Sequence, residues 1–187
     1  PLPTAAPPSD VKIRLIGNLR DVPVAQARTM LEKKHTASLR AHERALNADP
    51  EKHTSRNSIA WFCAFGIDSL LDLDRAHQLA SEALAHEPDN ENVLNTLGVI
   101  LYRQEKYAEA RASLEQSVTL SGGTAFDWYF LSMLSARDGD EIEATRFYNQ
   151  AVESQATLLQ DRPPHSLWEL ELTVLQHEAR AMIESTF

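Results

Sequence analysis

The 187-residue chain is poor in several features on which whole classes of protein depend. Its one cysteine, Cys63, excludes an intrachain disulfide framework and a multi-cysteine zinc site. A lone cysteine fits a reducing compartment, so we expect the cytoplasm. No apolar run approaches the roughly 20 residues that span a bilayer, so we expect no membrane insertion. Residues 1–8 lack the basic and apolar regions of a signal peptide, and we interpret them as a processed end or part of an interdomain linker.

Positive charge is scarce over most of the chain. Residues 1–56 contain ten Lys or Arg and six Asp or Glu (10 − 6 = +4), whereas residues 57–187 contain eight and twenty-one (8 − 21 = −13), which together give −9. Such an acidic body repels phosphate backbones, so we expect no nucleic acid partner. The hydrophobic fraction of 43% is nevertheless sufficient for a folded core.

Catalytic and metal-binding motifs are also missing. His35 and His42 are seven residues apart and Glu82 and His86 four, but no trio of such residues has the spacing of metal ligands. No histidine is spaced to activate Cys63 as a nucleophile. We therefore expect no catalytic residues, no metal and no other cofactor in this segment.

What the sequence does contain is a period of 34 residues. Ala76, Ala110 and Ala144 are spaced by 34, and the residue twelve positions before each is also small: Ala64, Gly98 and Ser132. Small residues let two antiparallel helices approach closely, and stacking of successive helix pairs covers the apolar stripe that each pair leaves exposed. The period therefore predicts an all-α fold, an α-solenoid of helix-turn-helix repeats.

Turn residues place the boundaries of these repeats. Pro88 with Asp89 as an N-cap, and Gly122-Gly123 followed by a capping box of Thr124 and Asp127, separate three units. The repeats are expected at 57–90, 91–124 and 125–161. Their first helices are expected at about 57–70, 91–104 and 125–137, and their second helices at about 73–86, 107–120 and 141–160.

Both ends of the chain depart from the period. Residues 1–22 are expected to form a linker or an extended arm, in which 11–16 alternate like a strand. Residues 23–56 form a degenerate leading helical unit, and 23–48 are either one long helix or two, with Thr36 capping the second. Residues 162–187 hold an expected helix at 166–184, begun by Ser166 and a glutamate three residues on, which caps the last repeat.

At these residues the chain resembles tetratricopeptide repeat proteins. The segment 92–103 and the Phe126–Leu131 run are also similar to repeat arrays of planctomycete multidomain proteins, some of which carry a serine/threonine kinase domain. The resemblance implies a non-catalytic scaffold for protein–protein interaction. Two alternatives remain open: a regulatory C-terminal segment of a larger enzyme such as a kinase, and a self-assembly module that associates through the N-terminal arm.

The family resemblance also implies a concave groove built from the first helix of each repeat. The lysine and asparagine clamp with which some relatives hold a peptide carboxylate is absent, because Trp61, Phe65 and Thr96 stand at its positions. We expect instead an aromatic groove for an apolar or amphipathic peptide. Its candidate residues are Trp61, Phe65, Asn92, Asn95, Val99, Tyr102, Arg103, Phe126, Tyr129 and Met133. The alternative is that these aromatics pack within the array or under residues 1–22.

Overall fold

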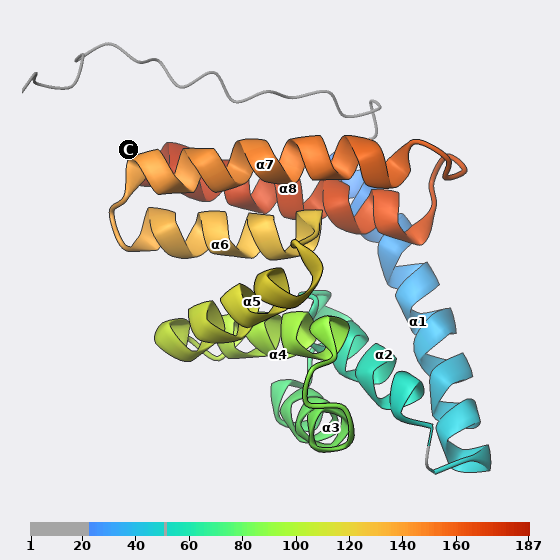
Figure 1. The fold of residues 1–187 in the computed structure, drawn as a ribbon. Helices are drawn as coiled ribbons and strands as arrows, with labels where there is room; N and C mark the ends of the chain where they lie inside the picture. The colour runs from blue at the N-terminus through green and yellow to red at the C-terminus, as the bar shows by residue number, and fades with distance from the viewer. Residues whose placement is uncertain (1–22, 51) are drawn as a thin grey trace, which may run out of the picture.

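The computed structural model describes residues 23–50 and 52–187, which fold into helices joined by short connections (Figure 1). Within these ranges there is no strand, and the predicted all-α class is confirmed. The arm expected at 1–22, with its strand-like 11–16, lies outside the described residues. The elements are α1 (Val24–Ala48), α2 (His53–Ala64), a 3-10 turn η1 (Asp68–Leu70), α3 (Leu73–His86), α4 (Glu91–Arg103), α5 (Tyr107–Ser121), α6 (Ala125–Arg137), α7 (Glu141–Leu159) and α8 (Leu167–Thr186).

The helices α2 to α7 form three successive helical hairpins, α2 with α3, α4 with α5 and α6 with α7. The three alanines of the 34-residue period, Ala76, Ala110 and Ala144, are fully buried at these contacts. Gly98 lies so close to the neighbouring helix that an added Cβ would be 2.6 Å from Cγ of Leu114. The small residues therefore mark the closest approach of paired helices, as the period predicted.

The helix ends are fixed by capping residues, and one of them differs from the prediction. The Thr124 and Asp127 capping box at the start of α6 is present, and Gly122 ends α5 in the left-handed region with a φ of 83°. The N-cap of α4 is Asn90 rather than Asp89, because the Asn90 side chain accepts hydrogen bonds from two backbone N–H groups of the first turn.

The first helix of the first hairpin starts and ends earlier than expected, whereas α3 spans the predicted residues. Its first helix was expected at about 57–70, but α2 spans His53–Ala64. Gly66, with a φ of 103°, lies two residues beyond the end of α2, in a conformation that residues with a side chain rarely adopt. The η1 turn then occupies part of the expected helix.

Residues 23–48 form a single helix, so the two-helix alternative is wrong. Thr36, the expected cap of a second helix, instead donates from Oγ1 to the carbonyl of Glu32 at 2.8 Å, within the uninterrupted helix α1. Only one side of the N-terminal half of α1 is buried, through Ala27, Leu31 and His35.

The first and last described helices meet. α1 packs against α2 at one end of the array and against α8 at the other, while α8 also packs against α6 and α7. Figure 1 shows α1 running from the level of α7 and α8 down along α2. The helices α2, α4, α6 and α8 thus form an inner wall whose two ends α1 connects.

Candidate functional site

The ten predicted groove residues fall into two sets. Six are buried or paired within the molecule, and these are Phe65, Val99, Tyr102, Arg103, Tyr129 and Met133. The other four line an open cavity, and these are Trp61, Asn92, Asn95 and Phe126. The predicted groove is therefore partly filled by the chain itself.

The filling element is α8. Its Glu171 accepts hydrogen bonds at Oε1 from Nε1 of Trp61 at 2.8 Å and pairs there with Nε2 of His35, also at 2.8 Å. About two helical turns further on, Glu178 accepts hydrogen bonds from both terminal nitrogens of Arg103. Arg103, one of the predicted groove residues, is thus already paired with a carboxylate of the same chain.

Two of the buried candidates, Tyr129 and Met133, lie in the interior and do not face an open groove. The Tyr129 hydroxyl donates to Oε1 of Gln155 on α7 at 2.6 Å, and the ring of Tyr129 is fully buried. Burial raises the pKa of the Tyr129 phenol far above its ordinary value of 10.0. Met133 is likewise fully buried, so neither side chain is accessible to a peptide in this arrangement.

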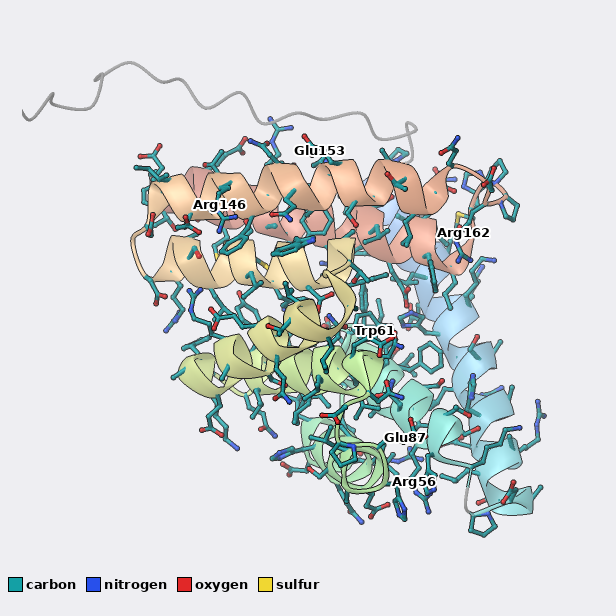
Figure 2. The ribbon with its side chains drawn as sticks, viewed as in Figure 1. Arg56, Trp61, Glu87, Arg146, Glu153 and Arg162 are labelled. Carbon is teal, nitrogen blue, oxygen red and sulfur yellow. The ribbon has the colours of Figure 1, made fainter. Side chains whose placement is uncertain are left out.

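The open part of the inner wall is a cavity of about 400 Å³ at the N-terminal ends of α2, α4, α6 and α8. This volume lies within the range of small-ligand pockets, about 300–1,000 Å³. Figure 2 shows Trp61 near the middle of the molecule, between the ribbons of α4 and α1. Besides the four predicted residues, the lining of the cavity includes His53, Asn57, Glu87, Glu91, Asp127, Trp168 and Glu171.

Aromatic rings form one wall of this cavity. Trp61 packs edge-on against Phe126 with ring centroids 5.3 Å apart, and Phe126 packs in the same manner against Trp168 of α8 at 6.3 Å. Trp168 is 37% exposed, which is unusual for a large aromatic side chain. Partly exposed Trp and Phe side chains are the types most enriched at interaction sites.

Polar side chains also line the cavity. Asn95 donates from Nδ2 to Oδ1 of Asp127 at 2.8 Å, so this amide is already committed to a side-chain partner. Asn92 is exposed, and its side-chain amide donates from Nδ2 to Oε1 of the adjacent Glu91 at 3.0 Å. Of the two predicted amides, Asn92 is thus the more available to hydrogen-bond a bound segment.

The sequence analysis missed two important residues of the inner wall, Trp168 and Glu171, and also His35 of α1, which pairs with Glu171. α8 was expected only to cap the last repeat, and the segment that forms α1 was expected only to belong to a degenerate leading helical unit. One signal was available, because Glu171 and Glu178 are seven residues apart and so lie on one side of a helix. When carboxylates share a helix with apolar side chains that must be buried, the carboxylates need polar partners on the neighbouring helices.

Candidate metal and redox chemistry has no support in the described part of the chain. Within residues 23–50 and 52–187, no group of three or more His, Cys, Asp or Glu is arranged to hold a metal ion. Cys63 is buried, and burial raises the pKa of its thiol, which favours the unreactive protonated form. None of the described helices combines the length and the apolar character needed to cross a membrane.

Comparison with known families identifies the repeat. Residues 72–118, which cover α3, α4 and most of α5, match the family model described as Tetratricopeptide repeat. A search of curated proteins gave no match. The chain thus contains a tetratricopeptide repeat within an α-solenoid fold, and such repeats are generally non-catalytic modules that bind proteins or peptides. The resemblance to planctomycete kinase-linked arrays stays a prediction.

Proposed function

We propose that this chain is a non-catalytic protein-interaction module that binds a short apolar or amphipathic segment of a partner protein in the cavity between α2, α4, α6 and α8. The carrying observation is the cavity itself, a hollow of about 400 Å³ on the inner wall whose aromatic side is formed by Trp61, Phe126 and Trp168. Because α8 fills the rest of the wall, the segment contacts only the N-terminal ends of these helices.

The binding site proposed here is shorter than the groove expected from the sequence. A helix running the full length of the inner wall would collide with α8, whose Leu170, Leu172 and Leu175 are fully buried. A few residues in extended form, with one apolar side chain against Phe126 and backbone groups near Asn92, fit the available volume. A cytoplasmic setting is part of the same proposal.

Selection of binders from a displayed library of random peptides, with the full chain as bait, tests this function. The selected peptides should lose at least about tenfold in affinity for the Phe126→Ala and Trp168→Ala variants, since aromatic anchors contribute most of the binding energy at such sites. Leu120→Ala is the matched control, because Leu120 is 46% exposed but lies outside the cavity. Peptides that bind all three variants as tightly as the unmodified chain would show that the cavity is not the binding site.

A further inference from the structure

The floor of the cavity contains two buried carboxylates. Asp127 is 1% exposed and Glu171 is 2% exposed, yet both line the open space. They come from different helices, α6 and α8, and from positions 44 residues apart (171 − 127). Burial of a carboxylate is costly unless a cation or several hydrogen bonds compensate it.

No lysine or arginine of the described residues forms an ion pair with either of these carboxylates. Asp127 accepts hydrogen bonds at 2.8 Å from the backbone N–H and hydroxyl of Thr124 and from the amide of Asn95, all neutral donors. Glu171 accepts from the Trp61 indole and pairs with His35. Glu178 on the same helix differs, because it is paired directly with Arg103. Among the described residues, the cavity floor therefore holds two carboxylates without a lysine or arginine partner, and His35 is the one basic side chain that pairs with either of them.

The rim adds charge of the same sign. Glu87 and Glu91 also line the opening, and His53 is the one titratable base among the lining residues that the structure describes. Carboxylates around a concave, partly desolvated space concentrate a negative potential there. Such a potential favours a cationic ligand and disfavours an anionic one.

The aromatic wall suits the same kind of ligand. The rings of Trp61, Phe126 and Trp168 line the cavity, and cations are attracted to aromatic faces. Trp168 already has a guanidinium on one side, since Cζ of Arg162 lies 3.5 Å from its ring centroid. An indole that stacks with one guanidinium at the surface is chemically suited to a second contact of this type.

We propose that the cavity receives the cationic side chain of a lysine or arginine that is flanked by apolar residues in the partner segment. This inference rests on the proposed function and adds the chemical class of the partner. The ammonium or guanidinium group lies between the carboxylates of Glu171 and Glu91, while the stem of the side chain and the flanking apolar residues pack on Phe126 and Trp168.

A set of matched pentapeptides tests the proposal with the full chain. Each has the sequence alanine-leucine-X-leucine-alanine with blocked ends, where X is arginine, lysine, citrulline, norleucine or glutamate. Citrulline has nearly the shape of arginine without its charge. Binding is followed by the indole N–H signals in proton–nitrogen NMR spectra, because the chain has three tryptophans and only Trp61 and Trp168 line the cavity. Trp128, stacked on Phe147 away from the cavity, is the internal control.

The arginine and lysine peptides should shift the signals of Trp61 and Trp168 and leave that of Trp128 unchanged. Their affinity should exceed that of the citrulline and norleucine peptides by about tenfold, and the difference should shrink as salt is added. The Glu171→Gln and Glu91→Gln variants should each bind the arginine peptide several-fold more weakly. Glu91 lies at the rim, so this variant keeps the test valid if the buried substitution prevents folding.

Glu153→Gln is the control substitution, since Glu153 is exposed on α7 on the outer side of the molecule (Figure 2). Equal or tighter binding of the norleucine and citrulline peptides would overturn the inference while leaving the proposed function intact. If no peptide of the set shifts Trp61 or Trp168, the inference is wrong, whereas the proposed function is decided separately by the selection from random peptides.

Discussion

Three of the four tyrosines ionise with difficulty in the folded chain. Burial raises the pKa of Tyr102 to about 12, and it also raises the pKa of Tyr129 and Tyr148 above the ordinary value of 10.0. Each of these rings lies in the interior formed by the inner wall and its outer helices. The phenol protons therefore report whether that interior is intact.

This gives a pH prediction. Between about pH 10 and about pH 12 the unfolded chain loses phenol protons that the folded chain keeps, so the free energy of unfolding falls as the pH rises. Below about pH 10 both states are protonated and these groups add no pH dependence. Urea unfolding midpoints at about pH 9 and about pH 11 measure the effect. Tyr129→Phe should reduce the loss between the two values, and phenolate absorbance from these tyrosines before unfolding would contradict the prediction.

Gly98 provides a second test at the level of a single residue. Its added Cβ would lie 2.6 Å from Cγ and 2.9 Å from Cδ2 of Leu114, so Gly98→Ala should destabilise the chain by about 1–3 kcal/mol despite the better helix propensity of alanine. Leu114→Ala alone should also be destabilising, by about 2–5 kcal/mol. Urea denaturation of the two single variants and the double variant should show that the double costs clearly less than the sum, and strict additivity would argue against the close contact.

At the level of the element, α8 is fastened to the inner wall by a bidentate ion pair. Arg103 of α4 and Glu178 of α8 have side chains only 19% and 24% exposed, and Arg103 also donates to the carbonyl of Phe65 at 3.3 Å. Burial opposes ionisation of Arg103, but the hydrogen bonds to Glu178 outweigh it and the pKa of Arg103 is raised. A charge held in this way is expensive to leave without its partner.

Glu178→Gln should therefore lower the free energy of unfolding by about 1–3 kcal/mol, since the charge on Arg103 then lacks its compensating carboxylate. The same helix contains a natural control, because Arg180 and Glu184 form a pair that is about half exposed. Glu184→Gln should change stability by no more than about 0.5 kcal/mol. Chemical denaturation of both variants makes the comparison, and equal effects would show that the inner pair adds nothing beyond a surface contact.

The hairpins of this fold were predictable because their signals are either repeated or local. The small residues recur at a fixed period of 34, whereas the capping box at Thr124 and the glycines after α5 each act within a few residues along the chain. The early end of α2 was harder to predict from the sequence, since Gly66 lies inside an otherwise continuous apolar pattern. The position of a helix end depends on one or two residues, whereas the repeat period is supported by many residues at once.

The candidate site was only partly predictable, because some of its contacts join residues that are far apart in the sequence. Trp61, Asn92, Asn95 and Phe126 were placed on the cavity by their repeat positions. Whether the remaining positions stay open depends on where α8 packs, and α8 lies far from them in the sequence. Periodicity shows that Tyr129 faces inward, but not that Gln155 of another helix is its partner.

At the scale of the whole molecule, the contact between α1 and α8 changes how the array opens. In an open solenoid the terminal helices contact a single neighbour and fray first. Here α8 has three neighbouring helices and the buried half of α1 has two.

Hydrogen exchange should therefore show protection in α8 similar to that in α4, although α8 is the last helix. Within α1 the amides of 27–35 should exchange more slowly than those of 40–47, because the buried residues lie only in the first segment. Native-state exchange measured amide by amide is the appropriate method. Rapid exchange throughout α1 and α8 would show that the two ends open independently of the repeats.

The pairing of His35 with Glu171 joins residues separated by 136 positions, with consequences for the order in which the chain is made. A ribosome adds about 5–20 residues per second, so about 7–27 s pass between synthesis of the two partners. The three hairpins can form within that interval, but the buried side of α1 has to wait for a helix that has not yet been synthesised. During biosynthesis Leu31 and the rings of Phe62 and Phe65 around His35 are thus the apolar surface on which a chaperone would act longest.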